Sequence, residues 1–197
     1  MNKNDFIENY FYQVSTITSL INKAEINRMI VKLKEIKIKK GRIFFIGVGG
    51  SAGNCSHAVN DFRKLCSIEA YAISDNVSEL TARTNDEGWL TIFSEWLKVS
   101  KINNKDGLFI LSVGGGDKKH KVSENIIEAI KVAKKNNARI FGIVGRNGGY
   151  TKKNGDNIIL VPNSDPKLVT PLAESFQSVI WHCIVSSPVL QDKKTKW

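Results

Sequence analysis

Two histidines of the sequence each have a carboxylate at a spacing that suits one face of a helix. Asp61 follows His57 by four residues, and Glu174 lies two turns before His182 on the same broad side. An imidazole beside a carboxylate suits general acid–base catalysis near neutral pH. Two histidines and two carboxylates also make a donor set for a divalent metal such as zinc. Taken alone, the first pair is also typical of a surface helix, and His182 beside Trp181 is also typical of a core.

A glycine-rich turn precedes His57 and is typical of an anion-binding site. Residues Gly47-Val48-Gly49-Gly50-Ser51 follow the apolar run 43–46, and a helical segment is expected over 58–65, with His57 opening it. Glycines let a ligand approach the backbone closely, and a helix start presents unpaired N–H groups. Phosphate is the usual occupant, so the turn predicts a phosphorylated small molecule. A tight turn without a ligand is the alternative.

Two better-known phosphate motifs fit this turn less well. Gly47, Gly49 and Ala52 approximate the dinucleotide pattern, but Glu69 opens the next apolar run instead of ending it. The lysine that a nucleotide P-loop requires is missing.

Composition indicates one ordinary globular domain. The 197 residues are 42% hydrophobic and 24% charged, and no apolar run approaches the ~20 residues of a membrane span. The N-terminus has no signal-peptide pattern, and three cysteines fit a reducing cytoplasm. The net charge of +10 comes with no nucleic-acid motif. It therefore predicts a lysine-rich solvated surface that attracts anionic substrates, with His120, among its lysine neighbours, as an exposed loop residue.

The periodicity predicts two N-terminal helices and then an α/β core. Residues 4–38 read as two amphipathic helices, and the aromatic face of the first needs a partner such as another subunit. Beyond residue 41, apolar runs at 42–46, 70–73, 108–111, 140–144 and 157–161 alternate with helical segments at 56–65, 89–99, 122–136 and 167–186. Continuous apolar strands that alternate with helices predict a three-layer sandwich around a five-stranded parallel sheet. Its ligands bind at the carboxyl ends of the strands, which are rich in glycine, hydroxyl and amide groups.

Four ordered motifs resemble the sugar isomerase (SIS) domain family, most closely its phosphoheptose isomerase group. They are Gly49-Gly50-Ser51 with His57 six residues on, 81–86 with Asn85-Asp86, 142–149, and the helix from Glu174 to His182. The resemblance covers nearly the whole chain. It implies one SIS domain over 1–197, with N-terminal helices over 1–40, the α/β core over 41–190 and a tail over 191–197.

The resemblance also implies an activity. It is the aldose–ketose isomerisation of sedoheptulose 7-phosphate to D-glycero-D-manno-heptose 7-phosphate through an enediol, for surface-polysaccharide synthesis. The expected protein is a cytoplasmic homotetramer with active sites at its subunit interfaces. It needs no organic cofactor and binds neither nucleic acid nor membrane.

The site residues implied by the resemblance fall into three sets. The proton-transferring residues correspond to Asp61 and His182. The ligands of one zinc ion per subunit correspond to His57, Asp61, Glu174 and His182. The substrate contacts correspond to Gly49, Gly50, Ser51, Asn85, Asp86, Ser112, Gly114, Gly115 and Glu174.

The sequence departs from the family pattern at several of these positions. Asp61 replaces a glutamate and shortens the reach by roughly 1.5 Å, and a misplacement of about 1 Å can cost a hundredfold in rate. Glu174 replaces a glutamine and adds a negative charge, and Val48 replaces an asparagine that contacts the sugar. The family's Ser-Thr-Ser-Gly phosphate loop reads Ser-Val-Gly-Gly from Ser112 and lacks two hydroxyls. Backbone N–H groups or the lysines at 118, 119 and 121 can replace them.

Two other functions remain open on the same fold. The first is a non-catalytic regulatory protein that binds a sugar phosphate, which the altered phosphate loop, Val48 and Asp61 favour. The second is an isomerase for another phosphosugar.

Overall fold

The computed structural model describes residues 3–162 and 165–194. Five strands form one all-parallel sheet in the order β2-β1-β3-β4-β5. The strands are β1 Ile43–Ile46, β2 Ala70–Ala72, β3 Gly107–Ser112, β4 Arg139–Val144 and β5 Asn157–Leu160. This confirms the predicted sheet. Nearly every residue of these strands is buried, as expected for a parallel sheet with helices on both faces.

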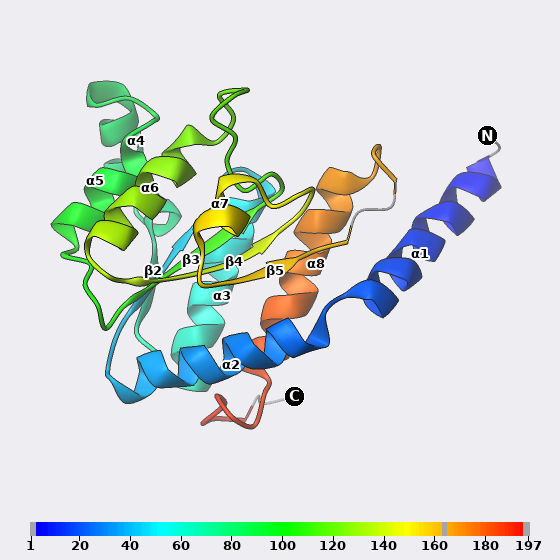
Figure 1. The fold of residues 1–197 in the computed structure, drawn as a ribbon, viewed down its shortest axis with the longest axis horizontal. Coiled ribbons are helices and arrows are strands. Elements are labelled where there is room, and N and C mark those ends of the chain that lie inside the picture. Colours follow the sequence, from blue (N-terminus) through cyan, green and yellow to red (C-terminus); the bar gives the residue numbers. More distant parts are fainter. Residues whose placement is uncertain (1–2, 163–164, 195–197) are drawn as a thin grey trace.

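Helices cover the two faces of the sheet as separate apolar layers (Figure 1). One layer contains α2 Lys23–Ile38, α3 Gly50–Cys66 and α8 Val169–Val185, which pack around Phe62, Phe109 and Trp181. The other contains α5 Ile92–Val99 and α6 Glu124–Lys135, which pack around Phe44 and Trp96. Figure 1 shows α3 and α8 side by side on the same face. Both helices run away from the carboxyl edge of the sheet.

The first helix, α1 Lys3–Leu20, extends away from the body of the molecule (Figure 1). Of its large apolar residues only Ile17 is fully buried, whereas Phe11 and Tyr12 are 64% and 66% exposed. Asn22 separates α1 from α2, and its side chain accepts hydrogen bonds from the first turn of α2. The two predicted N-terminal helices are therefore present, and the first one leaves an aromatic surface open.

Three helical details differ from the sequence expectation. Helix α3 begins at Gly50, inside the predicted turn, so His57 lies two turns into the helix instead of opening it. Helix α4, Val77–Asp86, was not expected because it fully buries no residue and packs only Leu80 against the core, which leaves a weak apolar pattern. Helix α7, Gly149–Asn154, has only six residues and begins with a glycine, so it reads as a loop.

The described part of the chain contains no helix long and apolar enough to cross a membrane. Its three cysteines are free thiols. Residues 195–197 of the predicted tail lie outside the described residues.

Candidate active site

The predicted anion-binding turn lies at the carboxyl end of β1 and places a buried hydroxyl there. Gly49 has a φ of 65°, a left-handed conformation that favours glycine, and α3 begins at the next residue. Ser51 is only 1% exposed, and its hydroxyl has no hydrogen-bond partner among the described residues. A buried hydroxyl without a partner is costly unless a ligand or water completes it. Ser51 therefore marks a polar ligand position at the start of α3.

The glycine run after β3 is locked against the loop after β4. The backbone oxygen of Gly115 accepts hydrogen bonds from the amide and the hydroxyl of Thr151, at 2.9 and 2.8 Å. A Cβ built on Gly115 would lie 2.1 Å from the oxygen of Gly148, and one on Gly149 would lie 2.3 Å from the oxygen of Gly114. Only glycines allow the two loops to approach so closely. The fixed loop suits backbone binding of an anion in place of the missing hydroxyls.

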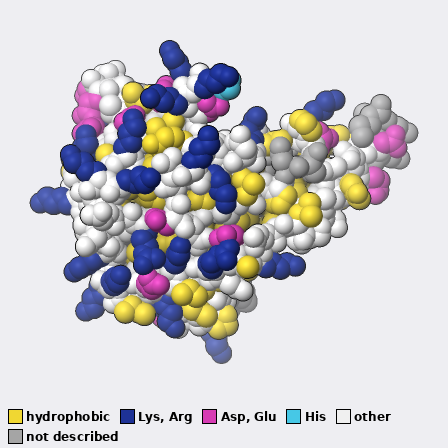
Figure 2. Space-filling view, in the orientation of Figure 1, with side chains coloured by type: hydrophobic (Ala, Val, Ile, Leu, Met, Phe, Trp, Pro, Cys, Tyr) yellow, Lys and Arg dark blue, Asp and Glu magenta, His cyan; other side chains and the backbone are white. Residues whose placement is uncertain are grey.

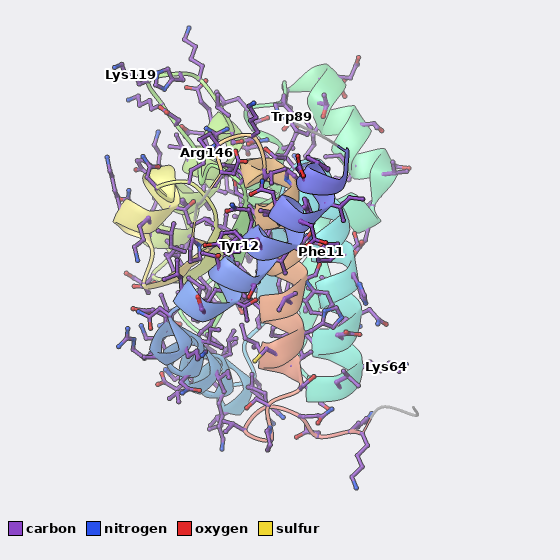
Figure 3. All side chains as sticks on the ribbon, turned by 90° about the vertical axis from the view of Figure 1, so that its right-hand side faces the viewer. Phe11, Tyr12, Lys64, Trp89, Lys119 and Arg146 are labelled. Carbon is purple, nitrogen blue, oxygen red and sulfur yellow. The ribbon has the colours of Figure 1, made fainter. Side chains whose placement is uncertain are left out.

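These loops surround a cleft of about 1190 Å³ at the carboxyl edge of the sheet. Ser51 and Ser112 line it, together with Gly114. Four cationic residues also line it, and their side chains have no hydrogen-bond or ion-pair partner among the described residues: Lys118, Lys119, Arg146 and Lys153. Figure 3 shows Lys119 and Arg146 toward the same end of the molecule, opposite Lys64 at the far end of α3. The cleft is therefore electropositive, although lysines and arginines also cover other parts of the surface (Figure 2).

A short hairpin forms one wall of this cleft. Asp117 and Val122 exchange two backbone hydrogen bonds, at 2.8 and 3.0 Å, and the residues between them form the tip. The Asp117 carboxylate pairs with His120 Nδ1 at 2.6 Å, and this hydrogen bond lowers the pKa of Asp117. His120 is an exposed loop residue, as predicted, but it also lines the cleft. We call residues 117–122 the basic flap.

Three of the four predicted metal ligands lie together on the outer faces of α3 and α8. Nε2 of His57 and Nε2 of His182 each lie 3.8 Å from Oδ2 of Asp61. One donor atom from each residue lies within 4.8 Å of the other two. Tetrahedral zinc with ligands at 2.0–2.1 Å places its donor atoms about 3.3 Å apart, so small rotations suffice to close this set. The donor types and spacing therefore fit a zinc ion.

Hydrogen bonds orient the members of this cluster. Nδ1 of His182 lies 2.8 Å from the backbone oxygen of Ser178. Because a carbonyl only accepts, Nδ1 carries the proton and the lone pair of Nε2 faces Asp61. Asn60 donates to the other carboxylate oxygen of Asp61, at 2.8 Å. Asp61 is mostly buried, with 14% of its side chain exposed, whereas the two imidazoles remain open to solvent.

The fourth predicted ligand, Glu174, lies elsewhere. Its carboxylate packs against the start of α3, where a Cβ built on Gly50 would meet Oε2 at 2.5 Å. Glu174 is not part of the histidine–aspartate group found among the described residues. In this structure its carboxylate thus lies beside the phosphate turn, and its role as a ligand stays a prediction.

The other predicted substrate contacts are only partly brought together. Gly49 and Gly50 form the turn beside Ser51, and Gly115 anchors the glycine loop. Asn85 and Asp86 end the exposed helix α4, hydrogen-bond to each other at 2.7 Å and do not line the cleft. Their contact with a sugar stays a prediction.

Sequence reasoning missed Arg146, Lys153 and Asn54. Arg146 adopts a φ of 50°, an unusual backbone for a residue other than glycine, at the carboxyl end of β4. Its place in a Gly-Arg-Asn-Gly-Gly turn was a usable signal. Lys153 and Asn54 carry no such signal, because only the packing of α7 and α8 reveals their neighbours.

The cleft and the histidine–aspartate cluster lie at different heights on one helix. Ser51 and Asp61 are ten residues apart on α3, which corresponds to about 15 Å along the axis. The arrangement can hold an anion at one end and move protons or bind a metal at the other.

Comparisons with known proteins show the family of this chain. The chain is 32% identical over 162 residues to a phosphoheptose isomerase of a Nitratiruptor species, covering 80% of each protein. It is 31% identical over 152 residues to phosphoheptose isomerase 1 of Campylobacter jejuni, covering 75% of this chain and 78% of that protein. It is also 30% identical over 160 residues to the lincomycin biosynthesis protein LmbN of Streptomyces lincolnensis, of which it spans only 56%. No protein-family model matches the chain.

Solved structures share the fold. Phosphoheptose isomerase GmhA from Neisseria gonorrhoeae superposes with a TM-score of 0.80 at 21% identity, covering 93% of this chain and 98% of that one. A phosphoheptose isomerase from Francisella tularensis gives 0.79 at 21% identity, covering 94% and 97%.

Proposed function

Because this chain belongs to the phosphoheptose isomerase family of SIS proteins, we propose that it converts sedoheptulose 7-phosphate to D-glycero-D-manno-heptose 7-phosphate. The coarser activity, that of a phosphosugar isomerase, follows from the family itself. We further propose that the protein works in the cytoplasm and feeds surface-polysaccharide synthesis. The observation that carries the proposal is the placement of a buried, unpartnered Ser51 hydroxyl on the same helix as Asp61.

The proposed phosphate position lies at the start of α3. The Ser51 hydroxyl and the backbone amides of the glycine loop donate to the phosphate oxygens, and the four cations of the cleft balance their charge. Binding at this end leaves the carbonyl end of an open-chain sugar free to reach along α3 toward Asp61.

The proposed isomerisation needs two proton transfers, which Asp61 and His182 share. The Asp61 carboxylate takes the proton from carbon 1 of the ketose, which leaves the cis-enediolate with its charge on the carbon 2 oxygen, and later returns that proton to carbon 2. His182 Nε2, which has a free lone pair, accepts the proton of the carbon 1 hydroxyl and delivers it to the oxygen on carbon 2. A zinc ion bound by His57, Asp61 and His182 would occupy the Nε2 lone pair of His182 and, in place of that proton relay, would polarise the sugar oxygens as a Lewis acid.

We propose that a second copy of the chain completes each site, in a homotetramer. On one protomer the two imidazoles are exposed and lie away from the cleft, and the aromatic face of α1 is open on the same chain. Covering the imidazoles by a neighbouring subunit would exclude water from the enediol.

A direct assay tests the proposal. Purified protein is incubated with sedoheptulose 7-phosphate, with and without added zinc, and the aldose product is detected by chromatography. We expect turnover that disappears in Asp61→Ala and in His182→Ala. The absence of aldose product under both conditions would falsify the proposed reaction.

A non-catalytic sugar-phosphate-binding role is the second candidate. The separate location of Glu174 and the exposed position of Asp86 favour the non-catalytic role, because neither group lies with the histidines and Asp61. This role predicts that sedoheptulose 7-phosphate raises the melting temperature without being converted. Ranking other phosphosugars in the same thermal assay tests whether the natural substrate is a different sugar.

A further inference from the structure

Asn54 connects α3 to three residues of α8. Its amide nitrogen donates to the backbone oxygen of Glu174 at 2.9 Å and to the side-chain oxygen of Gln177 at 3.0 Å. Its amide oxygen accepts from the hydroxyl of Ser178 at 2.7 Å. Both ends of this one amide group are therefore held by the neighbouring helix.

The contact lies in the packed interface between the two helices, beside buried Cys55. Gln177 is fully buried, so its oxygen has no water to replace the hydrogen bond from Asn54. Loss of a partner that leaves a buried polar group unsatisfied is costly. Sliding of α8 along α3 would break all three hydrogen bonds of Asn54 at once.

The same turn of α8 holds the active-site imidazole. The hydroxyl of Ser178 donates a hydrogen bond to Asn54, and its backbone oxygen accepts one from Nδ1 of His182. The opposite nitrogen of His182 faces Asp61 on α3. Helices α3 and α8 are thus joined both by the amide of Asn54 and by the 3.8 Å contact between Nε2 of His182 and Oδ2 of Asp61. A slip of one residue moves a helix by about 1.5 Å, which is enough to separate these atoms.

We propose that Asn54 is a positioning residue, which sets the register of α8 on α3 and thereby holds Nε2 of His182 toward Asp61. Its effect on catalysis rests on the proposed isomerase function. Its effect on the imidazole does not, so the two can be tested separately.

The experiment compares four variants with the wild-type chain. Asn54→Ala removes all three hydrogen bonds. Ser178→Ala removes only the hydroxyl, and Ser178→Thr keeps a hydroxyl. Ser175→Ala is the matched control, because Ser175 is an exposed serine on the same helix with no hydrogen bond among those found for the described residues. Ser178→Ala also covers the case in which Asn54→Ala does not fold.

Imidazole nitrogen NMR provides the main readout. The chain has three histidines, so single His→Gln variants assign the signals. We expect wild-type His182 to carry its proton on Nδ1. In Asn54→Ala the Nε2 signal of His182 should shift, because the imidazole moves away from Asp61, and a smaller shift should appear in Ser178→Ala. Ser178→Thr and Ser175→Ala should match the wild type.

Cobalt titration of the same proteins gives a second readout, with Co²⁺ alone as the probe. Second-sphere substitutions typically weaken metal binding about 10–100-fold, so Asn54→Ala should lie in that range, while Ser175→Ala should not change it. Where turnover is measured, kcat should fall with KM nearly unchanged, because the phosphate position is intact.

Two results would overturn the inference. One is a wild-type His182 protonated on Nε2. The other is a folded Asn54→Ala, or Ser178→Ala where the former does not fold, whose only change is a lower melting temperature. The expected shift of the His182 signal in Asn54→Ala, found in a protein without isomerase activity, would reject the proposed reaction and leave the inference standing.

Discussion

Asp61 is the residue at which the resemblance predicts a shorter acid than the glutamate of the family, and in the structure its carboxylate lies near two histidines. Its carboxylate lies 3.8 Å from each of two imidazoles. The side chain is mostly sheltered, whereas both histidines are open. The contact between α3 and α8 brings His182 to the shorter acid, so Asp61 does not need the extra methylene to meet it.

Replacing Asp61 by asparagine should separate charge from shape. Asp61→Asn keeps the size of the side chain but removes the base and a metal ligand, so kcat should fall about 10²–10⁴-fold. Binding of inorganic phosphate, which involves the other end of α3, should be unchanged. Steady-state kinetics and phosphate calorimetry check this. Full activity of Asp61→Asn would exclude it as the base.

The cysteines should differ strongly in reactivity. Burial raises the pKa of the Cys66 thiol to about 11 and raises that of Cys55 further. Both groups therefore stay protonated at pH 8, and the thiolate is the reactive form. Cys183 is exposed beside His182. Iodoacetamide at pH 8 should modify only Cys183 in the native chain and all three after unfolding, as read by peptide mass spectrometry. Modification of Cys66 at a similar rate would contradict its burial.

At the scale of elements, the two interlocked glycine loops form the floor of the cleft. A methyl group at Gly115 would lie 2.1 Å from a backbone oxygen, and the residue also has a φ of 70°. Gly53, by contrast, lies inside α3 with open space around it.

Two glycine substitutions should therefore have opposite signs. Gly115→Ala should lower the free energy of unfolding by about 1–3 kcal/mol, because a left-handed, crowded backbone position does not accept a side chain. Gly53→Ala should raise it by about 0.5–1 kcal/mol through helix propensity. Urea unfolding followed by circular dichroism measures both. Equal effects would refute the crowding at Gly115.

In the proposed binding mode, the basic flap and the loop after β4 supply positive charge for the phosphate through residues such as Lys119 and Arg146. A double variant, Lys119→Gln with Arg146→Gln, should raise KM about 5–20-fold and leave kcat nearly unchanged, because ground and transition states lose the same contacts. It should also reduce the salt dependence of KM. The control is Lys101→Gln with Lys105→Gln, which removes the same two positive charges from exposed positions ahead of β3. A normal KM for the double variant would show that backbone groups alone hold the phosphate.

The elements that the sequence predicted well are those whose pattern is set by burial. Strands such as 107–112 are continuous apolar runs, and their order along the chain implied a parallel sheet. Helix α4 has only a weak apolar pattern to detect, and the start of α3 is hidden by its glycines. The spacing of His57 and Asp61 predicted a shared helix face. Which face of α8 packs against the His57–Asp61 face of α3 depends on tertiary packing, and so does the separate position of Glu174.

At the scale of the whole molecule, α1 is the feature that a single chain leaves unexplained. It extends from the body, and Figure 3 shows Phe11 and Tyr12 pointing to different sides of the helix. Both are about two-thirds exposed. An extended helix with aromatic residues on more than one side suits burial between subunits.

Polar substitutions on α1 should therefore break the assembly. Phe11→Ser with Tyr12→Ser should shift the protein from a tetramer to smaller species and lower kcat, since the proposed sites need a second copy. Light scattering after gel filtration measures the mass. Lys101→Gln, on the exposed surface after α5, should not alter it. A monomeric wild-type protein with full activity would contradict the proposed assembly.

The glycine interlock restricts how this enzyme can diversify. Neither of the two crowded glycine loops can accept a larger residue unless the other loop moves away at the same time. Single substitutions that add a side chain at Gly115 or Gly149 are therefore blocked. The tip of the hairpin, residues 118–121, takes no part in this contact between the loops. Selection for new sugar phosphates, in nature or in the laboratory, should therefore accumulate changes at this tip while Gly115 and Gly149 stay fixed.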